Sequence, residues 1–278
     1  MPQANLIFDM GLHKGEDTDF YLRKGFDVVA FEANPILIAD CKRTFADYIA
    51  DGRLRIVEGA IAPRSAGDVV KFYQNANVSV WGTIDGDWAK RNDALGSSST
   101  IISVKRVDIS EIFESVGIPF YLKIDLEGVD VHVLRALSDF ADRPQYVSFE
   151  AEKVDQLALR DSLNILARLG YSKFKVVEQS ALPGSSGSFQ SLNGTAFHYT
   201  FLPEASGPFG EDIPQPWRSI PDVVREFNAI FRRYRLFGDN TLIQRLPYPL
   251  RRLSKIGYKF ATGYRGPMPG WHDIHASL

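Results

Sequence analysis

Short apolar runs rich in Val, Ile and Phe alternate with amphipathic stretches along most of the chain. Such runs predict strands, and the stretches between them predict helices. The alternation gives a strand at residues 4–8, a helix at 17–24, a strand at 27–32, a helix at 35–48 and a strand at 54–58. Asn34 is a suitable N-cap for the second helix, and Pro35 is a suitable first residue. This part of the chain therefore predicts three parallel strands joined by helices.

The same alternation resumes after a polar excursion. Two β-like pieces, residues 69–73 and 101–107, flank a polar stretch that we expect to lie beside a cofactor site. The pattern then predicts a strand at 119–125, a helix at 129–137, a strand at 145–150, a helix at 155–169 and late strands at 172–177 and 195–202. A Gly-Ser loop separates the late pair, which suits a terminal antiparallel hairpin on a mostly parallel sheet. Together they predict an α/β, Rossmann-like fold with a seven-stranded sheet and helices on both faces.

The composition changes after residue 202. The chain becomes rich in Pro and Gly and has one clear helix, predicted over residues 222–236, with Phe227, Phe231 and Tyr234 on its core-facing side. We therefore expect a cofactor-binding domain over residues 1–202 and a C-terminal extension over residues 203–278. The extension is expected to pack on or cap the substrate site.

Charge is distributed unevenly between these two parts. The net charge is -2, but residues 211–278 hold 11 Lys and Arg against 6 Asp and Glu, whereas the residues before them hold 21 against 28. A basic C-terminal region favours an anionic partner, such as a nucleotide-linked donor, a phospholipid head group or a polyanionic glycan, or is a solvated basic helix. The acidic body argues against a nucleic-acid partner.

Other features of the sequence restrict the class of protein. Apolar residues make up 45% of the chain and charged residues 24%, which is ordinary for a globular protein. Cys41 is the single cysteine, which excludes an internal disulfide and a cysteine-rich metal site. No targeting pattern precedes the first strand, and no apolar run approaches the ~18 residues of a membrane span. We expect a cytoplasmic protein without a transmembrane segment.

The turn after the first strand carries candidate cofactor contacts. Asp9 ends this strand, and Gly11 and Gly15 follow before the helix. Glycines in such a turn let the backbone approach a ligand, and amide groups at a helix start supply hydrogen-bond donors. Glu32 ends the second strand about 20 residues further on, where a carboxylate can accept hydrogen bonds from ribose hydroxyls. A solvated strand-end glutamate is the alternative.

Two further segments extend this site. Gly59 and Ala60 follow the third strand, where small side chains leave room for an adenine ring. In YLKIDLEG (121–128), the charges of Lys123, Asp125 and Glu127 alternate, which puts them on one face at the carboxyl end of a central strand. A structural ion pair between Lys123 and a carboxylate is the alternative.

Four motifs, DMGLHKGEDT, FEANP, LKIDLEG and VSFEAE, resemble those of the FkbM family of methyltransferases, and the resemblance covers roughly residues 5–202. The chain departs from the usual family pattern at Leu12-His13, where Ala-Asn is common, and at Ala33, where Pro is common. The resemblance implies a class I methyltransferase that uses S-adenosylmethionine to methylate oxygen, commonly a hydroxyl of a sugar or a natural product. The expected cofactor contacts are Asp9, Gly11, His13, Gly15, Thr18, Glu32, Ala33, Gly59, Ala60 and Asp125.

Methyl transfer to a hydroxyl needs an aligned donor and acceptor and a group that takes the hydroxyl proton. We expect Asp125 to take this role, with Lys123 and Glu150 as further catalytic residues. Asp125 and Glu150 are also the expected ligands if the enzyme uses Mg²⁺ to orient sugar hydroxyls. Weaker candidates for the base are Glu127, Glu152, His198, His272 and His275.

Two of these candidates have plainer interpretations. His198 lies in an apolar strand and is more typical of a core residue. His272 and His275 belong to the terminal WHDIH segment (271–275), whose tryptophan could stack on a sugar ring, although a frayed tail fits the pattern equally well.

Two other functions remain as alternatives. A nucleotide-dependent oxidoreductase or epimerase would use the same scaffold, but His13 occupies a glycine position of its G-x-G-x-x-G fingerprint. A non-catalytic binding module would tolerate replacement of Asp9, Glu32 and Asp125. We expect a small-molecule or glycan acceptor bound between residues 81–99 and the basic extension, and the sequence leaves a homodimer open.

Overall fold

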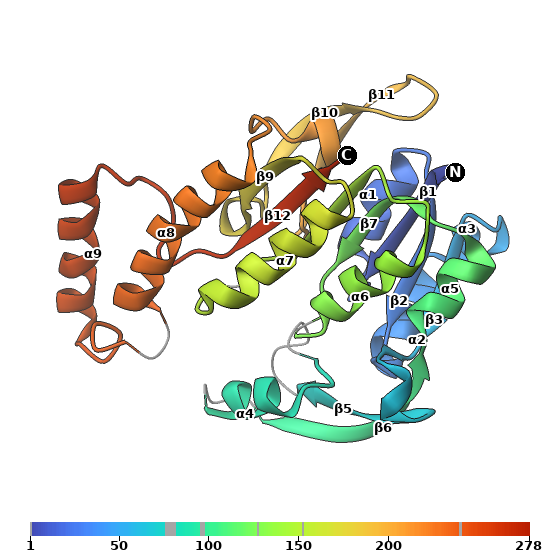
Figure 1. Ribbon diagram of the computed structural model, residues 1–278, viewed down its shortest axis with the longest axis horizontal. Helices are drawn as coiled ribbons and strands as arrows, with labels where there is room; N and C mark the ends of the chain where they lie inside the picture. Colours follow the sequence, from blue (N-terminus) through green and yellow to red (C-terminus); the bar gives the residue numbers. More distant parts are fainter. Residues whose placement is uncertain (1, 76–81, 95–97, 127, 152, 239–240) are drawn as a thin grey trace.

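A computed structural model describes residues 2–75, 82–94, 98–126, 128–151, 153–238 and 241–278 (Figure 1). Its main sheet has seven strands, in the order β3 (Leu54–Glu58), β2 (Asp27–Glu32), β1 (Gln3–Met10), β7 (Pro119–Ile124), β8 (Tyr146–Glu150), β12 (His272–Ser277) and β9 (Lys173–Glu178). The pairs from β3 to β8 are parallel, whereas β12 is antiparallel to both of its neighbours. The predicted α/β fold with a seven-stranded, mostly parallel sheet is confirmed.

The antiparallel strand comes from the end of the chain, which the sequence did not predict. β12 fills the place between β8 and β9, and all of its residues are buried. The strand expected at 195–202 is instead β11 (Ala196–Thr200), which pairs with β10 (Ser186–Gln190) in a separate hairpin. The expectation that it completes the main sheet is therefore wrong. The expected boundary after residue 202 does not separate the sheet from the extension, because β12 lies beyond it.

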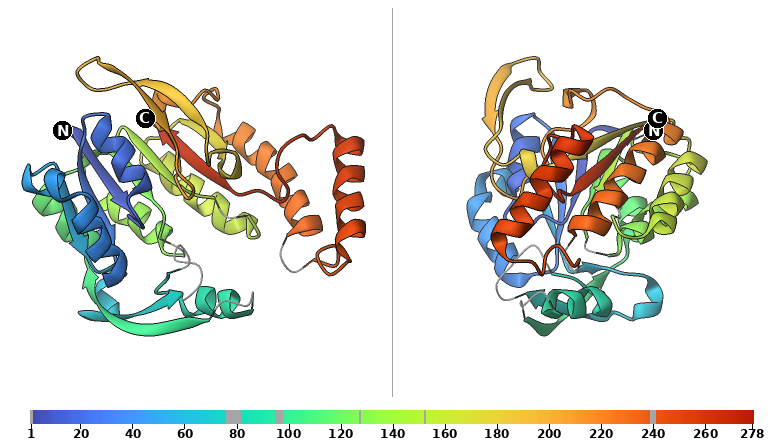
Figure 2. Two further views of the ribbon diagram at one scale, coloured as in Figure 1. Left: turned by 180° about the vertical axis from the view of Figure 1, so that it is seen from behind. Right: turned by 90° about the vertical axis from the view of Figure 1, so that its left-hand side faces the viewer.

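Helices cover both faces of the main sheet (Figures 1 and 2). One face packs against α5 (Ile109–Val116), α6 (Asp130–Ala136), α7 (Gln156–Arg168) and α8 (Ile220–Phe237). The other packs against α1 (Glu16–Arg23), α2 (Pro35–Thr44), α3 (Ala46–Ala50), the β10–β11 hairpin and residues 201–209. Phe227, Phe231 and Tyr234 are buried on α8, as predicted. His198 is exposed on β11, so the expectation of a core residue there is wrong.

The polar excursion forms a small layer at one edge of the main sheet. It contains the sheet β4 (Ala60–Ile61), β6 (Ser99–Val107) and β5 (Val69–Asn75), together with α4 (Gly86–Ala94). This layer lies beyond the carboxyl ends of β1 and β2 (Figure 1). Within the described residues, short 3₁₀ turns occur at η1 (Arg64–Ala66), η3 (Leu137–Asp139), η4 (Gln179–Ala181) and η5 (Gly210–Asp212).

The remaining helix, α9 (Tyr248–Thr262), stands at one end of the molecule, with α8 between it and the main sheet (Figure 2). None of its residues is buried. Across the described parts of the chain, no helix is both long enough and apolar enough to cross a bilayer.

Candidate functional site

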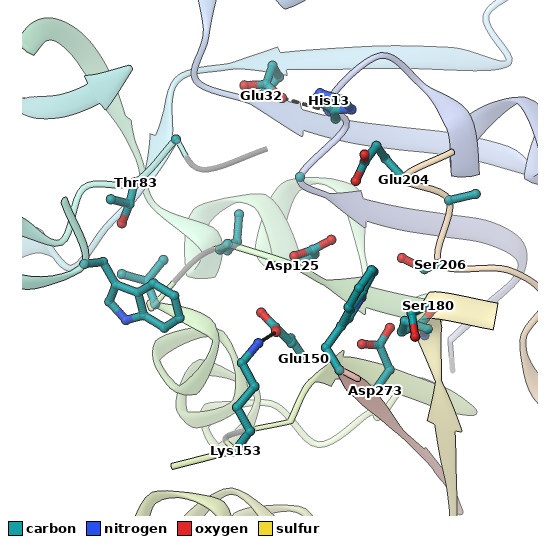
Figure 3. A pocket seen from close by; sticks show the side chains of 18 of the residues that line it. His13, Glu32, Thr83, Asp125, Glu150, Lys153, Ser180, Glu204, Ser206 and Asp273 are labelled. Carbon is teal, nitrogen blue, oxygen red and sulfur yellow. Dashed lines mark hydrogen bonds and ion pairs between the residues drawn. The ribbon is translucent and has the colours of Figure 1, made fainter. Parts of the chain in front are cut away.

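A cavity of about 740 Å³ opens at the carboxyl ends of the parallel strands. This volume lies within the range of small-molecule sites, ~300–1,000 Å³. Its walls come from the β1–α1 turn, the ends of β2 and β8, residues 59–61, the β7–α6 loop, η4, residues 203–206 and 267–271, and Asp273. Thr83 of the small layer lies on the side opposite Glu204 and Ser206 (Figure 3), and Trp88 of α4 also lines the cavity. The cavity therefore lies where ligands bind in open α/β sheets.

Glu32 fixes the β1–α1 turn at one end of the cavity. Its Oε2 accepts a hydrogen bond from the backbone N–H of His13 at 2.9 Å, and its Oε1 accepts from Ala33 at 2.9 Å and Asn34 at 2.8 Å. Burial raises the pKa of Glu32 against the effect of these three donors, which lower it. The side chain also lines the cavity beside His13 (Figure 3). Glu32 can therefore hold the turn and accept a ligand hydroxyl at the same time.

The glycines near this end serve contacts within the chain. Gly11 has a φ of +94°, and a Cβ on it would meet the carbonyl oxygen of Asp125. A Cβ on Gly59, with a φ of +134°, would meet the carbonyl oxygen of Lys105. Gly15 packs in the same way against the Phe45 ring and does not line the cavity. These glycines therefore let chain segments approach one another. From the sequence, we expected their small size to let the backbone approach a ligand.

Lys123 lies in a buried charge cluster under the cavity. Its Nζ is 3.3 Å from Asp9, 3.2 Å from Asp17 and 3.4 Å from Asp125, and it donates to the carbonyl oxygen of Gly11 at 3.2 Å. Burial raises the pKa of Asp17 to about 6, and it raises the pKa of Asp9 as well. The cluster joins the ends of β1 and β7 to α1, so it holds both strand ends in place.

Three predicted site residues, Asp9, Thr18 and Lys123, lie in or beside this charge cluster under the cavity and do not line the cavity wall. Thr18 is fully buried and donates a hydrogen bond to Asp9 at 2.6 Å. Neither residue lines the cavity, and Lys123 does not line it either. This placement favours positioning roles for all three over direct contact with a ligand.

Three carboxylates meet at the other end of the cavity (Figure 3). Asp125 directly follows β7 and is 43% exposed, whereas Asp273 is buried and is paired in register with Glu150 across β12 and β8. Glu150 accepts a hydrogen bond from Lys153 at 2.6 Å. Burial, followed by the negative charges of Asp125 and Glu150, raises the pKa of Asp273 well above its usual range. The three carboxyl groups therefore lie at the same end of the cavity but differ in burial and in their charged neighbours.

The cavity wall contains residues that sequence reasoning did not propose. Gln179 is buried, and neither its amide nitrogen nor its amide oxygen has a hydrogen-bond partner among the described residues. It directly follows β9, so the rule that ligands bind at strand carboxyl ends could have identified it. Asp273 belongs to the terminal WHDIH segment, for which the sequence left both a sugar-binding wall and a frayed tail open, and it was not among the expected bases. Tyr234, Glu204, Ser206 and Met268 also line the wall.

The weaker candidates for the base fall into three groups. His272 and His275 are buried in β12 and do not line the cavity, and burial lowers the pKa of His272 to about 4 and that of His275 to about 3. His198 lies on the β10–β11 hairpin, away from the cavity. Glu127 and Glu152, like Trp81 of the excursion, lie outside the described residues.

The carboxylates do not form a ready metal site. Among the residues that the structure describes, no group of three or more His, Cys, Asp and Glu is placed to hold a metal ion. Asp125 and Glu150, the expected ligands, each have a lysine ammonium within 3.4 Å. Among the described residues, both carboxylates of the expected Mg²⁺ site therefore already pair with a lysine, which does not fit a divalent cation there.

Comparison with known proteins identifies the class. Residues 9–173 match the methyltransferase FkbM domain, which is more than half of the chain. A methyltransferase FkbM from Methylobacillus flagellatus KT aligns with 64% of this chain and 41% of its own, at 17% identity and a TM-score of 0.39. The precorrin-6y C5,15-methyltransferase of Geobacter metallireducens GS-15 aligns with 72% of this chain and 77% of its own, at 11% identity and a TM-score of 0.35.

A third solved structure, Aeropyrum pernix fibrillarin with bound S-adenosyl-L-methionine, aligns with 64% of this chain and 61% of its own, at 11% identity and a TM-score of 0.34. No curated protein matches the chain. The fold and the matched domain define a Rossmann-like, S-adenosylmethionine-dependent methyltransferase. The chain belongs to the FkbM family of methyltransferases.

Proposed function

We propose that this methyltransferase acts on oxygen and methylates a hydroxyl group of a sugar, a glycan or a related natural product. One observation carries the proposal: a single cavity joins the turn anchored by Glu32 to the carboxyl groups of Asp125, Glu150 and Asp273. A polar cavity wall of this kind suits an acceptor with several hydroxyl groups, because carboxylates and amides can each bind them.

The Glu32 end is the proposed cofactor end. A carboxylate has more lone pairs than the three backbone donors use, so Glu32 retains acceptor sites for the two ribose hydroxyls. Wall residues that would contact the cofactor are Gly11, His13, Ala33, Gly59, Ala60 and Asp125. Asp9, Gly15 and Thr18 would support this wall without touching the ligand.

When bound, S-adenosylmethionine supplies a methyl group activated by its sulfonium. Transfer breaks the bond from this carbon to sulfur and forms a bond from it to the acceptor oxygen, whose proton must pass to a base. We assign this base to Asp125, because it is the most exposed of the three carboxylates and lies beside the ammonium of Lys123. Lys123 acts as a positioning residue, since it does not line the cavity.

Asp273 and Glu150 are assigned different roles at the acceptor end. Burial and the neighbouring carboxylates raise the pKa of Asp273 well above its usual range, which favours the protonated carboxyl group, the form that can donate a hydrogen bond to an acceptor oxygen. Glu150, paired with Lys153, offers an acceptor for a hydroxyl. Trp271 and Gln179 line the same end and would supply an aromatic surface and an amide. Residues 267–273 thus support the proposal that the C-terminal region helps to form the acceptor site.

Isothermal titration of the purified protein with S-adenosylhomocysteine tests the cofactor assignment. We expect micromolar binding that Glu32→Ala abolishes. Glu58→Ala is the matched control, because Glu58 is the register partner of Glu32 on β3 and does not line the cavity. Binding of NAD in place of S-adenosylhomocysteine would instead identify the oxidoreductase alternative.

The acceptor assignment is tested by incubating the protein with labelled S-adenosylmethionine and sugar or natural-product acceptors, with and without Mg²⁺. We expect a methyl ether as the product. Asp125→Asn should slow transfer by about 10²–10⁴-fold while S-adenosylhomocysteine still binds. A product methylated on nitrogen or carbon would contradict the proposal.

A further inference from the structure

The outward side of α9 is apolar. Leu250, Leu253, Ile256 and Phe260 follow one another at intervals of three or four residues, so they share one side of the helix. Their exposed fractions are 50%, 62%, 51% and 92%. Leu242 and Leu246, just before the helix, are 79% and 39% exposed. A contiguous apolar surface of this kind marks an interaction site on a soluble domain.

The polar side of α9 faces the rest of the protein. The Tyr258 ring packs on Phe237 of α8 with ring centroids 5.2 Å apart. Arg251 donates to the amide oxygen of Gln244 at 3.1 Å, and Lys255 donates to the carbonyl oxygen of Met268 at 2.9 Å. This orientation is the reverse of the usual one, in which the apolar side of a surface helix packs on the core.

The charge around this surface has one sign. Residues 241–270 contain six Lys and Arg and no Asp or Glu, and the six are Arg245, Arg251, Arg252, Lys255, Lys259 and Arg265. A second copy of the chain would bring another set of positive charges to the same place. An anionic partner with an apolar layer beneath its charged surface fits both the apolar side of α9 and the positive charge of residues 241–270.

We propose that α9 docks on the surface of an anionic phospholipid bilayer. Leu250, Leu253 and Phe260 enter the interfacial region. The arginine side chains exposed on this segment, those of Arg245, Arg252 and Arg265, lie beside the lipid head groups. The helix lies in the plane of the membrane surface and does not cross the bilayer.

Docking through α9 also places the bilayer close to the cavity. Residues 263–271 connect α9 directly to β12, and Pro267, Met268 and Gly270 of this connection line the cavity. The hydrogen bond from Lys255 ties the helix to the same connection. The membrane proposal does not depend on the identity of the methyl acceptor.

Co-sedimentation of the full-length protein with vesicles tests the proposal. We expect binding to phosphatidylcholine vesicles that contain phosphatidylglycerol, weaker binding at high salt, and little binding to phosphatidylcholine alone. The double variant Leu253→Ser and Phe260→Ser should bind at least about tenfold more weakly, because it removes two large apolar side chains from the docking side. Leu157→Ser is the matched control, since Leu157 is 78% exposed on α7.

Two results would overturn the proposal. One is equal binding of the wild type and the double variant to the anionic vesicles, including no binding by either. The other is a homodimer, seen by light scattering, that the double variant dissociates, since the apolar side of α9 would then be a self-interface. Titration of each variant with S-adenosylhomocysteine reports separately on folding and on the methyltransferase site.

Discussion

At the scale of single residues, the Lys123 ammonium compensates the negative charge of a buried group of carboxylates. Asp9 and Asp17 are almost fully buried, and the Lys123 ammonium lies within 3.4 Å of both. Removing one partner of a buried ion pair leaves an uncompensated charge, which costs ~3–5 kcal/mol. We therefore expect Lys123→Met to lower the free energy of unfolding by about this amount in urea denaturation followed by circular dichroism.

Lys42→Met is the control for this prediction. Lys42 also pairs with a carboxylate, that of Glu58, but the two side chains are 50% and 54% exposed. Such surface pairs contribute ~0–1 kcal/mol. Equal losses of stability in the two variants would show that burial does not set the energy of the Lys123 cluster.

His275 makes the stability of the folded protein depend on pH. Its ring is buried in β12, and neither ring nitrogen has a hydrogen-bond partner among the described residues. Burial lowers its pKa from 6.5 to about 3, so between these pH values the unfolded chain takes up a proton that the folded chain does not. Stability is therefore fully present above pH 6.5 and falls as the pH is lowered, by at most about 1.4 kcal/mol per pH unit.

We expect His275→Leu to reduce this loss of stability in acid. Urea unfolding of the variant and the wild type between neutral pH and pH 4 would measure the difference. His198→Leu is the control, because His198 is exposed on β11 and its replacement should leave the acid sensitivity in place. If the stability of His275→Leu depended on pH as that of the wild type does, the buried ring of His275 would not be the cause of the acid sensitivity.

At the scale of elements, the β1–α1 turn depends on close contact with the end of β7. Gly11 and Gly52 both have positive φ, +94° and +73°, but only at Gly11 would a Cβ meet another chain segment, the carbonyl oxygen of Asp125. Gly52→Ala should therefore cost about 1–2 kcal/mol for its conformation alone. Gly11→Ala should cost about 1–3 kcal/mol more and weaken S-adenosylhomocysteine binding. Thermal unfolding and calorimetric titration of both variants test this; equal effects would contradict it.

The elements that could be predicted are those whose hydrophobic pattern reports their burial. Apart from Asp9 and Lys123, the buried residues of β1, β2 and β7 are apolar. Glu32, Gly11 and Asp125 occur at the carboxyl ends of these strands, so the sequence placed these residues near one another. Alternation along a strand shows which side chains share a face, but it does not show what packs beneath that face. The pattern therefore could not show that the Lys123 side chain lies under the cavity and not in its wall. That layer depends on Asp17 from α1, which only the folded chain brings to Lys123.

β12 was missed for a related physical reason. Its sequence, HDIHAS, has the composition of a polar tail, yet every residue in it is buried. The strand is held by backbone pairing with β8 and β9 on both sides, which its side-chain pattern does not report. Asp273 and its place opposite Glu150 were therefore also beyond prediction.

At the scale of the whole molecule, residues beyond 202 divide into two parts with opposite relations to the core. β12 lies inside the main sheet, whereas α9 has no buried residue and touches the body through a few contacts such as that of Tyr258 with Phe237. The C-terminal region therefore contains both an essential strand of the fold and a helix whose loss the fold should tolerate.

Two deletions test this division. Removing residues 272–278 takes away a strand between two others, leaving β8 and β9 with unpaired backbone groups, and should abolish cooperative unfolding and S-adenosylhomocysteine binding. Replacing residues 241–262 with a Gly-Ser linker should retain both, because α9 contributes no buried residue. Circular dichroism and calorimetric titration would measure these outcomes. If the shorter deletion were tolerated, or the α9 replacement unfolded the protein, the core and peripheral parts of the C-terminal region would have to be reassigned.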